Sequence, residues 1–180
     1  IFMRKGTLTL NDGGKIANCW YTGVWVFTGL PDGESTFIMN GGEICNIGGS
    51  TLKGKQQNAA VWVSAGTNTY PKASFIMKDG SIHDNVVVAG AVYLPVAFGG
   101  FPQEFRMEGG SITNNKGITG VNNSGNGIFL RDGTVTMTGG TISGNSGMHG
   151  GGVYVQDYGR FTMSGGTITD NTALGGTENG

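Results

Sequence analysis

The hydrophobic positions of this chain fall into a short phrase that recurs along its length. Close copies are FIMNGGEICNI from Phe37, FIMKDGSIHDN from Phe75, FRMEGGSITNN from Phe105, VTMTGGTISGN from Val135 and FTMSGGTITDN from Phe161, and a looser copy is LTLNDGGKIANC from Leu8. Each copy alternates apolar and polar residues, reaches a pair containing glycine, and resumes with one isoleucine between polar neighbours. The pattern predicts a short strand, a sharp bend and a second short strand in every copy.

A third alternating segment lies farther along in five of the copies. These segments are GVWV from Gly23, AVWV from Ala60, AVYL from Ala91, GIFL from Gly127 and GVYV from Gly152. No helical period of 3.6 residues occurs anywhere, and the copies differ in length only in their connections, as in solenoid proteins. We therefore expect an all-β fold, a single-stranded right-handed parallel β-helix (solenoid) of about six coils with three short strands each, forming one domain over residues 1–180.

Stacking of successive copies would place equivalent residues side by side. The aligned isoleucines, which we expect to form one buried column, are Ile16, Ile44, Ile82, Ile112, Ile142 and Ile168. Three residues after the isoleucine, the last four copies carry an asparagine: Asn85, Asn115, Asn145 and Asn171. Cys19 and Ile47 stand there in the first two copies. An inward asparagine at a corner can satisfy backbone groups of the turn, so we predict an asparagine ladder that begins at the third copy.

The composition narrows the range of partners. Glycine makes up 36 of 180 residues, but it is periodic and marks bends, which is not typical of disordered chains. Only 13% of the residues are charged and the net charge is −1, so no basic stripe is present for nucleic acid. No apolar run approaches the length of a membrane span, and we expect no membrane insertion by this segment. Because the chain starts at Ile1 and ends in GGTENG, we expect it to be a fragment of a longer protein.

The residues that carry chemistry do not form an obvious active site in the sequence. The acidic residues are scattered, and Asp84 and Asp170 stand at corners where aspartate is a common turn residue. His83 and His149 lack partners at the spacing of a metal site or a catalytic triad, so we expect both on the surface. Cys19 and Cys45 should lie on adjacent coils about 8 Å apart, which disfavours a disulfide. We expect no catalytic residue, metal site or cofactor.

One outward column is aromatic, with Trp25, Trp62, Tyr93, Phe129 and Tyr154 at equivalent positions. In one interpretation these rings stack on one another, or a loop covers them, and they serve the structure. In the other they form an exposed apolar ribbon on a polar surface, which is typical of an interaction site. These five residues are the candidate binding residues of the chain.

The repeats resemble those of a known group of proteins. The phrases GGTISGN and GGTITDN, with GGGVYV as the third strand, are similar to the repeats of right-handed parallel β-helix proteins on bacterial cell surfaces, including polymorphic outer-membrane proteins. The chain departs from that pattern because its asparagine follows an isoleucine in place of a phenylalanine. The resemblance implies an extracellular or cell-surface bacterial β-helix used for adhesion, display or as a carrier, and it carries over no catalytic residue.

We therefore expect a non-enzymatic surface or secreted module that binds neutral glycans or acts as a structural stalk, with a polysaccharide or neighbouring domains of the parent chain as partners. The alternative is a fragment of a carbohydrate-active β-helix enzyme, a polysaccharide lyase or hydrolase. A minor alternative is an ice-binding solenoid, since serine and threonine flank the isoleucine in the later copies.

Overall fold

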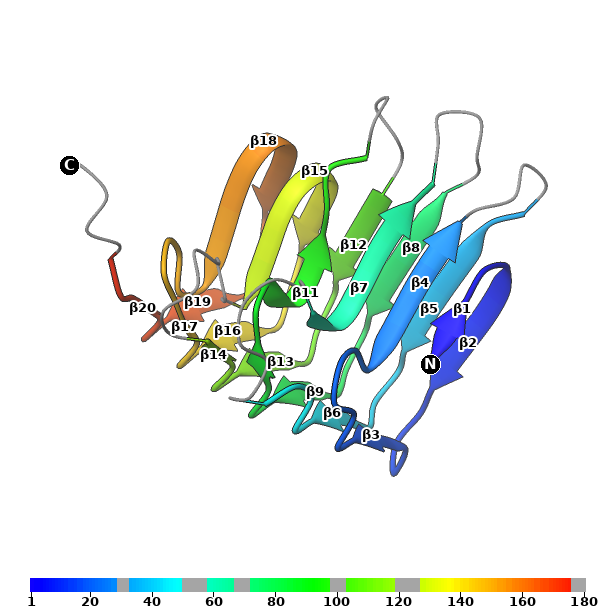
Figure 1. Ribbon diagram of the computed structural model, residues 1–180, viewed down its shortest axis with the longest axis horizontal. Coiled ribbons are helices and arrows are strands. Elements are labelled where there is room, and N and C mark those ends of the chain that lie inside the picture. The colour runs from blue at the N-terminus through cyan, green and yellow to red at the C-terminus, as the bar shows by residue number, and fades with distance from the viewer. Residues whose placement is uncertain (29–32, 50–57, 67–71, 98–102, 119–126, 176–180) are drawn as a thin grey trace.

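The computed structural model describes residues 1–28, 33–49, 58–66, 72–97, 103–118 and 127–175. Within these ranges all regular elements are strands, and all the strand pairings are parallel (Figure 1). This confirms the expected all-β fold and the parallel stacking of the repeats. The same ranges contain no helix with the length and apolar character needed to cross a membrane.

The largest sheet, sheet A, has two halves that face each other across the core (Figure 1). One half comes from the aromatic segments: β1 (Phe2–Met3), β4 (Val24–Thr28), β7 (Ala59–Ala65) and β11 (Gly90–Leu94). The other half comes from the first strand of each phrase: β2 (Gly6–Leu10), β5 (Ser35–Met39), β8 (Ala73–Met77) and β12 (Gln103–Met107). The long strands β15 (Ile128–Met137) and β18 (Val153–Met163) run through both halves. Because β1 and β2 follow each other in the chain yet stand at opposite ends of the strand order, the sheet is nearly closed.

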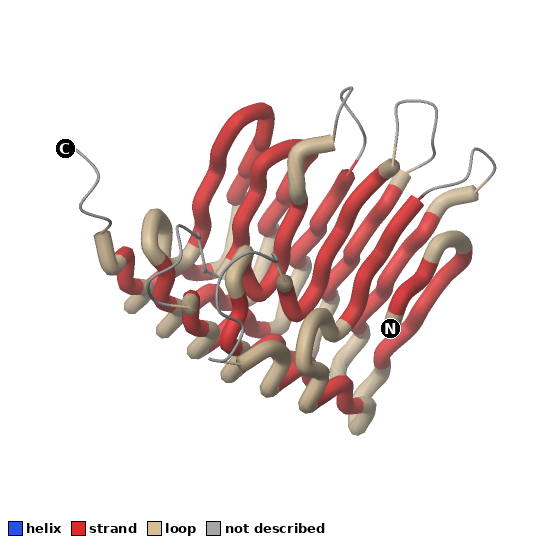
Figure 2. The backbone as a smooth tube through the Cα atoms, viewed as in Figure 1, coloured by secondary structure: helices blue, strands red, loops and turns tan. Residues whose placement is uncertain are grey.

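Two further sheets complete the structure. Sheet B contains the isoleucine strands: β3 (Lys15–Ala17), β6 (Glu43–Cys45), β9 (Ser81–His83), β13 (Ser111–Thr113), β16 (Thr141–Ser143) and β19 (Thr167–Thr169). Sheet C contains two-residue strands that follow the asparagine corner: β10 (Val86–Val87), β14 (Lys116–Gly117), β17 (Ser146–Gly147) and β20 (Thr172–Ala173). Sheet B runs along the lower edge of the molecule in Figure 2, with short turns between its strands and the neighbouring sheets. The sequence pattern did not predict sheet C.

Residues with positive φ angles form the corners. The glycine pair supplies the first corner, as predicted, and Gly110 has a φ of +75° with space for no side chain, because an added Cβ would lie 2.6 Å from the carbonyl oxygen of Gly80. The second corner precedes the asparagine column and uses Asn46, Asp84 and Asp170 at φ angles of 54°, 52° and 54°. Aspartate and asparagine tolerate this left-handed conformation better than most residues do. The prediction that Asp84 and Asp170 are turn residues is therefore confirmed.

The interior follows the predicted columns except at the two ends. Ile44, Ile82, Ile112 and Ile142 are fully buried between the sheets. Ile16 is half-buried, and the side chain of Ile168 is 38% exposed. The expectation that all six isoleucines would be buried is wrong for these two, because β3 and β19 are the outermost strands of sheet B and have a neighbour on one side only.

The asparagine ladder begins at the third copy, as predicted. The Nδ2 group of Asn85 donates to Oδ1 of Asn115 at 2.7 Å, Asn115 donates to Asn145 at 2.8 Å, and Asn145 donates to Asn171 at 2.9 Å. Each Nδ2 group also donates to the carbonyl of an isoleucine in the preceding copy. Asn85, Asn115 and Asn145 are completely buried, so these bonds satisfy polar atoms that would otherwise lack partners.

Candidate functional site

The predicted aromatic column exists on the outer face of sheet A. Strand pairing places Trp25 beside Trp62, Trp62 beside Tyr93, Tyr93 beside Phe129, and Phe129 beside Tyr154. Neighbouring ring centroids are 5.1–5.2 Å apart along this column. Phe2 extends the column at one end, with its ring centroid 5.0 Å from that of Trp25. Three of the four contacts between the five predicted rings are stacked, and the contact between Trp62 and Tyr93 is edge-to-face. The rings therefore pack against one another, as the structural interpretation of the column requires.

The rings differ in their exposure to solvent. Tyr93 is fully buried and Phe129 is 4% exposed, so the middle of the column is not an open surface. Ala59 and Ala89 pack in the same cluster as these two rings. Trp25, Trp62 and Tyr154 are half-buried. The exposed ribbon of five rings that one interpretation of the sequence requires is therefore reduced to these three residues, because stacking and the surrounding chain cover the other two.

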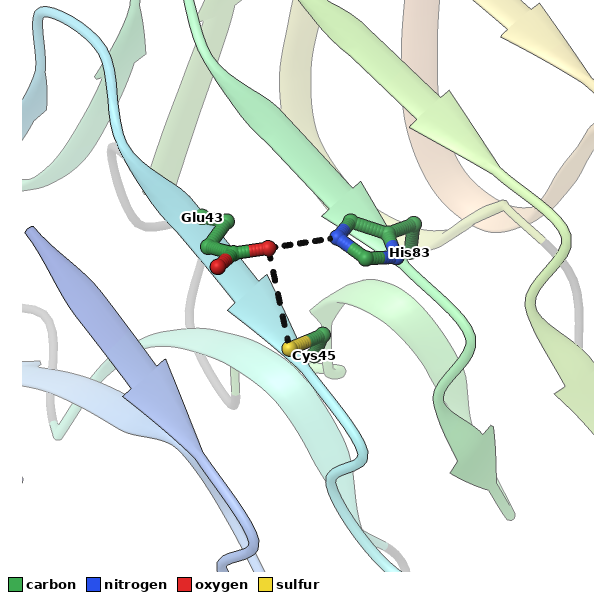
Figure 3. A group of neighbouring side chains, drawn as sticks. All are labelled: Glu43, Cys45 and His83. Atoms are coloured by element: carbon green, nitrogen blue, oxygen red, sulfur yellow. Dashed lines mark hydrogen bonds and ion pairs between the residues drawn. The ribbon is translucent and has the colours of Figure 1, made fainter. Parts of the chain in front are cut away.

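A second group of functional side chains lies on the outer face of sheet B, where Glu43, Cys45 and His83 converge (Figure 3). The Nε2 atom of His83 is 3.0 Å from Oε2 of Glu43, and the Sγ atom of Cys45 is 4.0 Å from the same oxygen. Each residue offers one ligand atom: a carboxylate oxygen of Glu43, the Sγ atom of Cys45 and a ring nitrogen of His83. These three atoms lie within 4.8 Å of one another. Cys45 is 1% exposed, while Glu43 and His83 are half-buried. The group thus unites a carboxylate, a thiol and an imidazole at one place.

The strand pattern explains this convergence. Glu43 and Cys45 flank the inward Ile44 on β6, so both side chains stand on the outer face. His83 flanks the inward Ile82 on β9, and strand pairing aligns it with Cys45. Lys15 on the neighbouring strand β3 forms an ion pair with this group: its Nζ atom is 2.8 Å from Oε1 of Glu43.

Electrostatic contacts shift the pKa values of Glu43, His83 and Lys15. The hydrogen bond and ion pair with Lys15, followed by the contact with His83, hold the pKa of Glu43 below its ordinary value. Burial of the ring lowers the pKa of His83, but its contacts with Asp84, at 2.7 Å from Nδ1, and with Glu43 outweigh burial and raise the net pKa. The pKa of Lys15 is raised by Glu43 first and by Cys45 second. Carboxylates thus face both ring nitrogens of His83.

The sequence pattern did not predict this group. Both histidines were expected on the surface without suitable partners, which is wrong for His83 because the fold brings Glu43 and Cys45 to it. The signal was present in the repeat alignment, since Cys45 and His83 each directly follow an aligned isoleucine.

The other histidine lies outside this group. His149 is exposed, and its ring centroid is 5.4 Å from that of Tyr154. Both cysteines are free, in agreement with the prediction that Cys19 and Cys45 lie too far apart for a disulfide. Cys19 packs against the edge of the core.

Comparison with protein-family models, curated proteins and solved structures finds no match to this chain.

Proposed function

We propose that the chain is a right-handed parallel β-helix of six coils that acts as a non-enzymatic binding module at a bacterial cell surface or in secreted form. The parallel pairing of equivalent residues in successive copies supports the helical coil, since parallel crossover connections are right-handed in about 98% of cases. Such a stack presents each outward position as a column along the molecule. A column of like side chains suits a ligand that itself repeats, such as a polysaccharide or an extended chain.

The aromatic column is the observation that carries the binding proposal. It places large rings on the side of sheet A that faces away from the main core, where a purely structural strand needs only polar residues. The buried rings of Tyr93 and Phe129 would anchor the column, and the half-buried rings of Trp25, Trp62 and Tyr154 would contact the ligand. The indole nitrogen of Trp25 donates to Oγ of Ser64 at 2.8 Å, which fixes the orientation of that ring.

The chemistry of the surface favours a neutral glycan. The net charge of −1 offers no field that would attract a strongly charged polymer. Sugar rings present C–H faces that can pack against the flat faces of aromatic rings, and this contact needs no charge on the ligand. The proposed ligand is therefore a neutral polysaccharide, and a neighbouring domain of the parent chain is the other occupant that the test must consider.

Binding to a panel of soluble neutral and acidic polysaccharides, measured by affinity electrophoresis and calorimetry, tests the proposal. The double variant Trp25→Leu with Trp62→Leu keeps apolar bulk but removes the indole faces, and it should weaken binding to a neutral polysaccharide at least tenfold. Trp20→Ala is the matched control, because Trp20 is 66% exposed and lies outside the column. That variant should bind as the wild type does.

Other outcomes have clear meanings. Equal binding by the wild type and the double variant, with the fold intact by circular dichroism, would contradict a role of the column in glycan binding. Shortened polysaccharide products in the same mixtures would favour the enzymatic alternative. An absence of binding to every glycan of the panel would also overturn the glycan proposal.

A further inference from the structure

A second candidate site lies on sheet B, away from the aromatic column of sheet A. Glu43 and Cys45 on β6 and His83 on β9 offer three different metal-binding groups from two adjacent strands (Figure 3). We propose that these three side chains bind a divalent transition-metal ion, and that Zn²⁺ fits the site best. The proposal does not depend on glycan binding, because it uses other residues and another face of the molecule.

The geometry of the three ligand atoms is close to that of a zinc site. Tetrahedral zinc with bonds of about 2.0–2.3 Å holds neighbouring ligand atoms roughly 3.3–3.6 Å apart. The Nε2 atom of His83 and the Oε2 atom of Glu43 are 3.0 Å apart, and the Sγ atom of Cys45 is 4.0 Å from that oxygen. All three ligand atoms lie within 4.8 Å of one another, so side-chain shifts on the order of 1 Å would bring them to tetrahedral spacing.

The ligand types select the metal. Thiolate and imidazole suit zinc and related transition metals, whereas calcium and magnesium prefer sites made entirely of oxygen. As the bonds to zinc form, the thiol of Cys45 releases its proton to solvent, and so does Nε2 of His83 wherever the ring is protonated on both nitrogens. The resulting thiolate and the carboxylate of Glu43 balance the two charges of Zn²⁺, and the neutral imidazole keeps its proton on Nδ1 beside Asp84. Lys15 contacts the other oxygen of Glu43, Oε1, and leaves Oε2 for the metal. Three protein ligands leave the fourth position for water or for an external ligand.

Asp84 provides the outer support that zinc-binding histidines commonly have. Its Oδ2 atom lies 2.7 Å from Nδ1 of His83, so a proton on Nδ1 keeps Nε2 directed toward Glu43. This carboxylate–histidine pair orients the ring and makes the imidazole a stronger ligand. Asp84 is thus a positioning residue and His83 is a metal ligand in the proposed site.

Titration of the full chain with Co²⁺ under reducing conditions tests the site, because cobalt bound by a thiolate absorbs in the near ultraviolet and in the visible range. We expect one equivalent of Co²⁺ to produce both bands and Zn²⁺ to abolish them by displacement. Cys45→Ser should remove the near-ultraviolet band, and His83→Gln should weaken binding at least tenfold. The sequence contains two cysteines and two histidines, so Cys19→Ser and His149→Gln are matched controls that should bind as the wild type does.

A milder variant tests the role of Asp84. In three other copies asparagine occupies the same corner: Asn18, Asn46 and Asn114, with φ angles of 58°, 54° and 56°. Asp84→Asn therefore preserves the turn. We expect this variant to fold normally and to bind Zn²⁺ about 10–100-fold more weakly. Unchanged affinity would overturn the positioning role of Asp84. Absence of the cobalt bands in the wild type, or their loss in Cys19→Ser with retention in Cys45→Ser, would overturn the metal site itself.

Discussion

Four hydrogen bonds hold the side chain of Asn115 in the middle of the asparagine ladder. Its Oδ1 atom accepts from the backbone and the side chain of Asn85, and its Nδ2 group donates to Ile82 and Asn145. Replacement by alanine leaves the buried backbone N–H of Asn85 without this acceptor, and each such loss costs about 1–3 kcal/mol. We therefore expect Asn115→Ala to lower the free energy of unfolding by roughly 2–4 kcal/mol, measured by denaturant titration.

Asn171 is the matched control for that experiment. It has the equivalent position in the last copy, but it is only half-buried, so water can replace part of what its side chain provides. Asn171→Ala should cost less than half of what Asn115→Ala costs. Equal losses would mean that burial does not determine the strength of the ladder.

At the residue scale, spacing alone predicted the ladder but not the metal-binding group. The asparagine stands at a fixed distance from the aligned isoleucine, so its column follows from the alignment of the copies. The same alignment places Cys45 beside His83. Their contact with Glu43 depends further on side-chain rotamers and on the left-handed turn at Asp84, which no one-dimensional pattern specifies.

Single glycines with positive φ angles form the first corner of the repeats. The φ angle of Gly110 is +75°, a conformation that costs an L-residue about 1–2 kcal/mol, and a Cβ atom would also contact the carbonyl oxygen of Gly80 at 2.6 Å. Gly110→Ala should therefore lower the free energy of unfolding by roughly 2–4 kcal/mol. Gly175→Ala is the control, because its φ angle is +66° but nothing lies within 4 Å of the added atom. If both variants lose the same free energy of unfolding in denaturant titrations, then backbone strain alone accounts for the need for glycine at position 110, and close packing of the corner does not contribute.

At the scale of the strand, the sequence pattern predicted the strands in which apolar and polar residues alternate and missed the strands that lack this alternation. The three strands of each phrase have apolar residues at every second position, and the structure confirms them. The strands of sheet C have two residues each, such as Lys116–Gly117 and Ser146–Gly147, and show no shared apolar pattern. They are strands only because the neighbouring repeat aligns beside them. The continuity of β15 and β18 across both halves of sheet A was also unpredicted, and it follows from short connections in the last copies.

Across the whole molecule, burial is deep in the middle repeats and shallow at the last one. Phe105 and Met107 are fully buried, whereas the equivalent Met163 on β18 is 42% exposed. The difference arises because each repeat is covered by the repeats on either side of it, and the last described repeat has a neighbour on one side only. The stability of stacked repeats is approximately a sum of contributions from each repeat and from its contacts with neighbours. Local stability should therefore fall toward β19.

Hydrogen exchange of the folded chain can measure this gradient. Ile82 on β9 and Ile112 on β13 have fully buried side chains, and their strands have a neighbouring strand on both sides. We therefore expect their amides to exchange only when the whole structure unfolds. The amide of Ile168 on β19 lies at the edge of sheet B under a side chain that is 38% exposed, and it should exchange at least tenfold faster. Thr172 and Lys116 allow the same comparison within sheet C. Equal protection of Ile112 and Ile168 would show that the repeats open as one cooperative unit, which the uneven burial of the isoleucine column argues against.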